Sequence, residues 1–178
     1  MKMSQIKLTP AIRFAGYTED WEQCKLSDFS KITMGQSPDG ATYSDYPTDY
    51  ILVQGNADIK NGNVVPRIWT TQKIKTSEPG DIIMTVRAPV GEVCKNSYNV
   101  VIGRGVCAFK GNDFLYQYLI RLNKSGYWKK LSVGSTFESV NSDSISNVII
   151  DYPSLNEQIK IGTIFNNLDN LITLHQRE

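Results

Sequence analysis

The stretch Gly80-Asp-Ile-Ile-Met-Thr-Val-Arg-Ala-Pro-Val-Gly91 decides the class of fold. Its apolar and β-branched run predicts a strand over residues 81–86, because such runs bounded by turn residues are typical of strands. The Ala-Pro-Val-Gly segment that follows indicates a turn. We therefore expect the chain to reverse there and to form a hairpin with the next apolar run.

Short apolar runs separated by turn residues continue on both sides of this hairpin. Further strands are expected at residues 50–54, 91–94, 99–102, 106–109 and 147–150. Helical patterns interrupt them at residues 25–32 and from residue 113 to about residue 131. Many short strands with a few helices predict an α+β fold, followed by a C-terminal helix of the coiled-coil type.

The sequence changes character at Pro153, since all 7 prolines and 12 of the 13 glycines lie at or before it. We therefore expect a globular domain over residues 1–152 and the start of a long helix over residues 153–178. Ser154 and Glu157 fit a capping box, in which each side chain bonds the backbone N–H of the other residue.

Apolar residues of this helix recur at spacings of 3 and 4, which is typical of a coiled-coil seam. The seam, which we predict to be a helix interface, consists of Ile161, Ile164, Leu168, Leu171 and His175. The helix reaches Glu178 without Gly, Pro or a capping residue, so we expect the chain to have been cut from something longer. One hypothesis is that the piece acts chiefly in assembly, with this helix pairing with another chain.

The charge is close to balanced, with 19 basic and 18 acidic residues and a net charge of +1. Taken whole, this does not indicate a nucleic-acid binder. Residues 60–130, however, hold 12 basic and 4 acidic residues, whereas residues 1–59 have a net charge of −3 and residues 131–178 one of −4. A basic middle between acidic ends favours one face that binds a polyanion.

Length and composition exclude several classes of protein. A chain of 178 residues with 40% hydrophobic and 21% charged residues is typical of a globular domain. No apolar run approaches the roughly 20 residues that cross a bilayer, and we expect a cytoplasmic protein. Cys24, Cys94 and Cys107 lack the spacing of a zinc site or a disulfide framework, which predicts buried free thiols.

Few residues are suited to catalysis. His175 is the sole histidine, so a Ser/His/Asp or Cys/His arrangement has no base, and no phosphate-binding or dinucleotide-binding glycine loop occurs. We expect no cofactor, no metal and no catalytic residues. One alternative stays open: Asp39, Asp58 and Lys60 have the spacing of a Mg²⁺-dependent nuclease, although Asp39 lies in a segment with the composition of a turn.

Polar and basic side chains suited to DNA are more numerous. Residues 36–49 form a long loop without an apolar pattern, a length that is uncommon unless the loop is functional or disordered. Arginine suits guanine, Asn and Gln suit adenine, and lysine or hydroxyl groups suit phosphate. The candidate DNA-binding residues are Ser37, Thr42, Tyr43, Gln54, Asn56, Arg67, Arg87, Arg104, Lys129, Lys130, Ser135 and Thr136.

The order of several motifs resembles that of the specificity subunit of type I restriction-modification enzymes. The motifs are Arg13-Phe-Ala-Gly-Tyr-Thr-Glu-Asp-Trp-Glu-Gln23 leading into Lys25-Leu-Ser-Asp, the stretch from Gly80 to Gly91, Ile102-Gly-Arg104, Gly134-Ser-Thr-Phe137, and Pro153-Ser-Leu-Asn-Glu-Gln-Ile-Lys-Ile161 followed by Leu168-Asp-Asn-Leu-Ile172. Each motif is loose, but their order is specific and covers nearly the whole chain.

The resemblance implies a target recognition domain that reads one half of a split site in double-stranded DNA, followed by the first part of a spacer helix. In that family a full subunit carries two such domains, separated by two antiparallel helices that set the spacing of the half-sites. The resemblance further implies that the subunit has no catalytic centre and that its partners are a methyltransferase and a restriction subunit. With one such domain, this chain corresponds to the N-terminal half of a subunit, and a homodimer through the helix is a further expectation.

Overall fold

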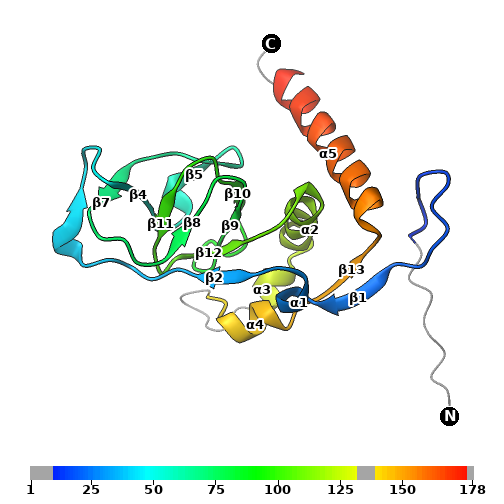
Figure 1. Cartoon of the computed structure of the whole chain (residues 1–178), viewed down its shortest axis with the longest axis horizontal. Helices are drawn as coiled ribbons and strands as arrows, with labels where there is room; N and C mark the ends of the chain where they lie inside the picture. The colour runs from blue at the N-terminus through cyan, green and yellow to red at the C-terminus, as the bar shows by residue number, and fades with distance from the viewer. Residues whose placement is uncertain (1–9, 132–138, 176–178) are drawn as a thin grey trace.

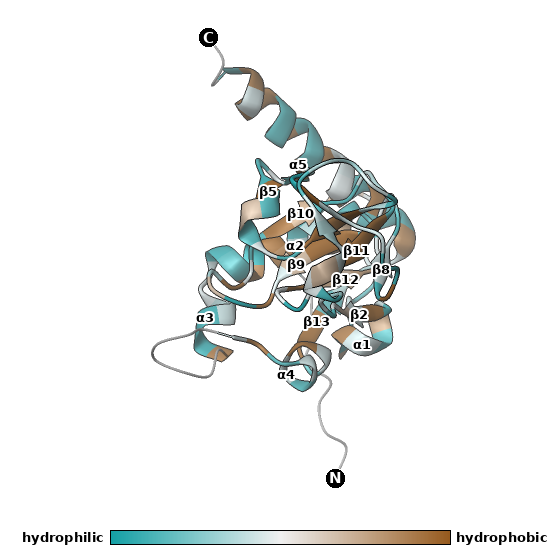
Figure 2. Cartoon of the chain, turned by 90° about the vertical axis from the view of Figure 1, so that its left-hand side faces the viewer, coloured by the Kyte–Doolittle hydropathy of each residue, from teal (hydrophilic) through white to brown (hydrophobic). Residues whose placement is uncertain are grey.

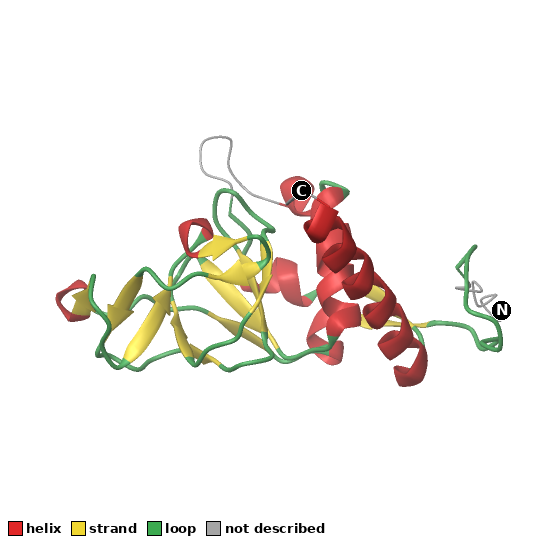
Figure 3. Ribbon diagram, turned by 90° about the horizontal axis from the view of Figure 1, so that it is seen from above, coloured by secondary structure: helices red, strands yellow, loops and turns green. Residues whose placement is uncertain are grey.

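Residues 10–131 and 139–175 make up the described part of the computed structural model, shown in Figure 1. Its strands form two sheets and a separate antiparallel pair. The α-helices gather on one side of the sheets, as Figure 3 shows from above. None of the helices in these two ranges is both long and apolar enough to cross a membrane.

The first sheet contains the hairpin that the sequence predicts. Strands β9 (Ile82–Thr85) and β10 (Val93–Lys95) pair antiparallel, with Met84 opposite Val93, so this prediction is confirmed. The sheet has six strands in the order β2, β12, β9, β10, β6 and β5. The other four strands are β2 (Ile32–Met34), β12 (Val106–Phe109), β6 (Asn63–Val64) and β5 (Ile59–Lys60).

The second sheet has five strands in the order β3, β7, β4, β11 and β8. These are β3 (Tyr43–Ser44), β7 (Ile68–Thr70), β4 (Tyr50–Val53), β11 (Val100–Ile102) and β8 (Thr76–Ser77). Two short 3-10 helices, η1 (Gly40–Thr42) and η2 (Asn56–Asp58), precede β3 and β5. Val53, Ile83 and Ile102 belong to a cluster of buried apolar residues that both sheets share. Figure 2 shows the hydrophobic character of β9 and β11.

The helical side of the molecule is built on a larger core around the fully buried Leu119 and Trp128. Its short elements are α1 (Leu26–Phe29), α4 (Ser142–Ser146) and the antiparallel pair of β1 (Glu22–Lys25) with β13 (Ile149–Tyr152). Together with the two sheets they confirm the predicted α+β class.

The helix expected from residue 113 to about residue 131 is two helices, so that prediction was wrong. α2 (Asp113–Lys124) ends just before a turn, and α3 (Tyr127–Leu131) begins after it. Gly126 lies between them with φ at +72°, a left-handed conformation that favours glycine and ends helices. The break allows Trp128 on α3 to turn inward, where its side chain is fully buried.

The C-terminal helix is confirmed as α5 (Leu155–His175), but its predicted capping box is wrong. The Glu157 side chain is 1% exposed and accepts hydrogen bonds from Nε and Nη2 of Arg13, both at 2.8 Å. A bidentate charged pair is stronger than a bond to the N–H of Ser154, and it ties the N-terminal segment to the first turn of α5.

All three cysteines are free, and Cys94 and Cys107 are buried, as predicted. Cys24 is partly buried. Burial raises the pKa of Cys94 to about 12 and also raises the pKa of Cys107, because a thiolate is poorly solvated in an apolar core.

Candidate nucleic-acid interface

Three chain segments cross closely where the two sheets meet. They are the residues after β2, those after β4, and the turn between β11 and β12. The N–H of Gly35 donates to the carbonyl of Val106 at 3.0 Å, and the N–H of Gly103 donates to the carbonyl of Val53 at 2.8 Å. The N–H of Gln36 donates to the carbonyl of Ile102 at 2.9 Å. Bonds between backbone groups therefore link all three segments at the crossing.

Glycine is required at this crossing because the backbones approach so closely. A Cβ atom at Gly35 would overlap the carbonyl oxygen of Gly103, and one at Gly105 would overlap the carbonyl oxygen of Gln54. We call Gly35, Gly103 and Gly105 the glycine junction. A short window of sequence cannot show this crossing, because the segments that meet there are distant in the chain.

The glycine junction presents Arg104 to solvent. Ser37 Oγ accepts from both the backbone N–H and the Nε–H of Arg104, each at 3.3 Å. The terminal nitrogens of the guanidinium have no partner among the described residues. Ser37 and Arg104, which the sequence proposed separately, therefore form one unit in which the arginine is oriented before any ligand binds.

Arg87 lies one residue from the same junction. The N–H of Val86 donates to the carbonyl of Gly105 at 2.8 Å, and Arg87, which is exposed, forms a β-bridge with Ser139. Ser139 directly follows residues 132–138. The predicted site residues Ser135 and Thr136 fall in that range and lie outside the described residues.

Gln54 and Arg67 bond a carboxylate that the sequence assigned to a different role, and Asn56 lies in the same loop. Asp58 is buried, and its Oδ2 accepts from the N–H of Gln54 at 2.7 Å and from the N–H of Gly55 at 3.2 Å. Its Oδ1 lies 3.5 Å from Nη1 of Arg67, whose side chain is 48% exposed. Asp58 thus organises the loop that carries Gln54 and Asn56.

A weak signal for this role of Asp58 is present in the sequence. The run Gln54-Gly-Asn-Ala-Asp58 has the composition of a turn after a strand, where an aspartate side chain commonly accepts backbone N–H groups. Spacing alone could not separate that use from a metal site.

The nuclease alternative receives no support. Asp39 is exposed and caps η1 by accepting from the N–H of Ala41 at 3.0 Å, while Asp58 is engaged by backbone and by Arg67. Lys60 lies exposed in β5. Within the part of the chain that the structure describes, no group of three or more His, Cys, Asp or Glu side chains is arranged to hold a metal ion.

Thr42 and Tyr43 serve the internal structure of their loop. Thr42 Oγ1 donates to the carbonyl of Asp39 at 2.7 Å and lies 2.8 Å from Thr70 Oγ1, and the Tyr43 hydroxyl donates to the carbonyl of Pro38 at 3.3 Å. The loop is therefore ordered by hydrogen bonds within itself and to Thr70 of β7. Tyr46, which the sequence analysis did not select, is 80% exposed there.

Lys129 and Lys130 are exposed on α3, the helix that leads into residues 132–138. α3 is anchored by Trp128, which packs so closely on Gly91 that a Cβ there would lie 2.5 Å from the indole ring. The hairpin that carries Arg87 and the helix that carries the two lysines thus share one packing contact.

The predicted helix interface is largely exposed. Ile161 packs against the main core, but Ile164, Leu168 and Leu171 are 43%, 47% and 55% exposed, and His175 is exposed at the end of α5. No element of the described chain covers them, so their use as an interface stays a prediction.

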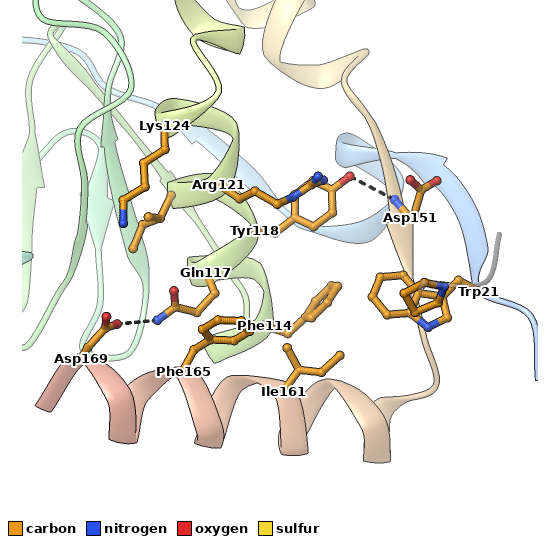
Figure 4. Close-up of a pocket in the computed structure, with 12 residues that line it drawn as sticks. Trp21, Phe114, Gln117, Tyr118, Arg121, Lys124, Asp151, Ile161, Phe165 and Asp169 are labelled. Atoms are coloured by element: carbon orange, nitrogen blue, oxygen red, sulfur yellow. Dashed lines mark hydrogen bonds between the residues drawn. The ribbon is translucent and has the colours of Figure 1, made fainter. Parts of the chain in front are cut away.

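A groove of about 650 Å³ lies along the contact between α5 and α2, beside the strand pair of β1 and β13. Figure 4 shows Ile161 and Phe165 of α5 pointing toward Phe114 and Tyr118 of α2, with Trp21 at one end. Gln117 donates to Asp169 across the other end at 2.7 Å. The groove is lined mainly by apolar groups and belongs to the helical side of the molecule.

Chemically, the glycine junction and the Asp58 loop place three guanidinium groups and two amide side chains on ordered backbone. Guanidinium groups bind phosphate or the O6 and N7 atoms of guanine, and amides bind adenine through paired hydrogen bonds.

Comparisons with known proteins agree with this chemistry. The family model described as "Type I restriction modification DNA specificity domain" matches residues 18–178. The chain is 30% identical over 168 residues to a putative type I restriction enzyme MjaX specificity subunit of Methanocaldococcus jannaschii, covering 90% of this chain and 39% of that protein. The MjaIX specificity subunit of the same organism is 29% identical over 168 residues, with 86% of this chain and 39% of that protein covered.

Solved structures show the same fold. A chain from a study of complex assembly and conformational transition of the type I R-M system matches with a TM-score of 0.79 at 29% identity, covering 92% of this chain and 42% of that one. The HsdS subunit from Thermoanaerobacter tengcongensis matches with a TM-score of 0.75 at 27% identity, covering 96% of this chain and 42% of that one. The chain thus spans about two fifths of the length of these relatives.

Proposed function

The chain belongs to the type I restriction-modification DNA specificity domain family, and from this premise we propose that it recognises one half of a bipartite site in double-stranded DNA. It thereby confers sequence specificity on a type I restriction-modification complex. The observation that carries the proposal is the glycine junction, where Ser37 orients an exposed Arg104 close to Arg87.

In this proposal basic and hydroxyl groups fix the domain on phosphates, while side chains on ordered loops read bases in the major groove. Arg104, Arg87 and the amides of Gln54 and Asn56 contact base edges. Lys129 and Lys130 contact phosphates, as do the hydroxyl groups of Ser135 and Thr136. Preorganisation supports this assignment, because side chains already held in place lose less conformational entropy on binding.

The proposal includes no reaction within this chain and no cofactor of its own. Methylation and cleavage belong to a methyltransferase subunit and a restriction subunit, which are its partners in the cytoplasm. The motif order of the sequence supports this division of labour. Residues 1–152 then form the recognition domain, and residues 153–178 begin the helix that joins it to a second recognition domain.

The exposed side of α5 supports the same assembly. Ile164, Leu168 and Leu171 are large apolar side chains about half exposed, and apolar groups in such a row are typical of a helix interface. We propose that they pack against a second helix, from the rest of a full subunit or from a second copy of this chain.

The test is selection of duplexes with a randomised segment, followed by affinity measurement at several salt concentrations. We expect one short sequence to be enriched and its affinity to fall steeply with salt. Arg104→Ala should abolish the preference at one base pair, a loss of about 1–3 kcal/mol, whereas Lys130→Ala should weaken binding to all sequences alike. Lys31→Ala, an exposed lysine outside the site, serves as the control. Equal binding of all sequences would refute the proposal.

A further inference from the structure

Besides the Arg13–Glu157 pair at its start, α5 is held against the rest of the molecule by three polar bridges along the side that faces α2. Asn112, the residue before α2, donates to Gln158 at 2.9 Å. Gln117 of α2 donates to Asp169 at 2.7 Å. The middle bridge comes from the first sheet: Lys95 Nζ donates to Asn166 Oδ1 at 3.0 Å. Of these three, only the lysine links α5 directly to a strand.

The Lys95 side chain contacts two helices at once. Besides Asn166 on α5, its Nζ lies 2.6 Å from Asp113 Oδ1 at the start of α2. The same ammonium stands 4.8 Å from the centre of the Tyr116 ring, a cation–π distance. Its backbone is fixed in β10, where it pairs with Ile82 of β9 and Asn63 of β6. The lysine is thus anchored in the sheet and bonded to both helices.

Gly162 brings α5 within reach of this lysine. A Cβ at Gly162 would lie 2.6 Å from the Cβ of Asp113 and 3.1 Å from the backbone nitrogen of Phe114. α5 therefore approaches the first turn of α2 as closely as a glycine permits. Asn166 lies one turn further along α5 on the same side, where Lys95 reaches it.

A single ion pair that is about half exposed contributes little to stability, so the arrangement is better suited to fixing a direction. Within residues 10–131 and 139–175, no hydrogen bond or ion pair ties α5 to another element beyond Asp169, and the helix extends away from the sheets (Figure 1). Any rotation of α5 at its contact with α2 would be amplified at its far end, because the helix is rigid over its length.

We propose that Lys95 is a positioning residue that fixes the direction in which α5 leaves the recognition domain. Resting on the proposed function, this makes Lys95 a determinant of the distance between this half-site and the half-site read by a second recognition domain attached through α5. It acts through Asp113 and Asn166 and does not touch DNA.

The test measures the orientation of α5 by double electron–electron resonance between spin labels at Lys60→Cys in β5 and Asn170→Cys in α5, with Cys24→Ser in the background. Cys94 and Cys107 are buried and will not be labelled. We expect a narrow distance distribution for the parent protein and a distribution at least about twofold wider for Lys95→Met. Lys95→Arg should restore the narrow distribution, since arginine also pairs with carboxylates and stacks on aromatic rings.

A matched control separates orientation from general stability. Lys110 forms ion pairs of 2.6 Å with Glu78 and 2.8 Å with Asp81, away from α5, so Lys110→Met should leave the distribution unchanged. An unchanged width in folded Lys95→Met, or equal widening in Lys110→Met, would overturn the proposal. If Lys95→Met fails to fold, Asn166→Ala replaces it, because this change removes only the α5 side of the bridge. A wider distance distribution in Asn166→Ala supports the proposal, and an unchanged one overturns it.

Half-site binding distinguishes this inference from the proposed function. Unlabelled Lys95→Met should bind the selected half-site within about twofold of the parent, because the glycine junction is intact. A larger loss would show that the lysine acts on recognition and would overturn its positioning role. A parent protein that binds no DNA would refute the proposed function, while the resonance measurement would still decide whether Lys95 orients α5.

Discussion

Replacing Asp58 with alanine tests whether this carboxylate organises the loop that carries Gln54 and Asn56. The change removes the acceptor of two backbone N–H groups, at 2.7 and 3.2 Å. A buried donor without an acceptor costs about 1–3 kcal/mol, and water reaches these two donors only in part. The bond to the half-exposed Arg67 adds about 0–1 kcal/mol. We expect Asp58→Ala to lower the free energy of unfolding by about 2–4 kcal/mol in total.

Asp58→Asn is the matched variant, because it keeps one acceptor oxygen for the two backbone N–H groups and loses the negative charge together with the oxygen that faces Arg67. We expect it to cost about 1 kcal/mol, the difference between a charged and a neutral hydrogen bond. Urea unfolding followed by tryptophan fluorescence measures both values. The affinity for the selected half-site should also fall, by about tenfold for Asp58→Ala, since the side chains on the loop lose their fixed positions.

An Asp58→Ala protein that unfolds with the same free energy as the parent would refute this reasoning. Incubating both proteins with plasmid and Mg²⁺ adds a second check. Cleavage by the parent that disappears in Asp58→Ala would establish the nuclease alternative in place of the structural role.

Three further predictions concern the core and the helix. Gly105→Ala should lower the free energy of unfolding by about 2–3 kcal/mol, since its Cβ would overlap the Gln54 carbonyl. Gly40 has open space around it, so Gly40→Ala should change this free energy by less than about 0.5 kcal/mol. Urea titration measures both values, and equal effects would contradict the close contact at Gly105. Raising the pH above about 9 should destabilise the fold, because the pKa of Cys94 is about 12 in the folded chain and its ordinary value is 9.0, so the unfolded chain releases the proton first. The stability that protonated Cys94 contributes is fully present below the unfolded pKa. It should fall by up to about 1.4 kcal/mol per pH unit between the two values, and Cys94→Ala should remove this part of the slope in unfolding curves from pH 8 to 10.5. Any concentration-dependent dimer seen by sedimentation should be lost in Leu168→Asp, and a dimer that survives this change would place the contact elsewhere.

Local patterns predict the elements of this fold well, because strands and helices depend on residues close in sequence. The run from Asp81 to Val86 is apolar and bounded by turns, and it forms β9 in the predicted hairpin. The break at Gly126 was missed because a single glycine in a helical pattern is often tolerated, and only the burial of Trp128 shows why the chain turns there.

Contacts between distant residues could not be predicted in this way. Glu157 fits a capping box by local spacing, yet Arg13, 144 residues away, takes both of its oxygens. The pairing of Ser37 with Arg104 likewise depends on three segments crossing, which no single window of sequence contains. The residue types of the candidate site were predictable from DNA chemistry, but their grouping required the topology of the two sheets.

At the glycine junction, the backbone that holds position 104 does not depend on which side chain stands there. The backbone bonds from Gly103 to Val53 and from Val86 to Gly105 do not involve the Arg104 side chain, and the overlaps that demand glycine lie at Gly35 and Gly105. Position 104 can therefore accept many different side chains while the surrounding fold stays the same. A scaffold of this kind allows new sequence preferences to arise by single substitutions, and it makes position 104 the first choice for a library that redirects the domain to other DNA sequences.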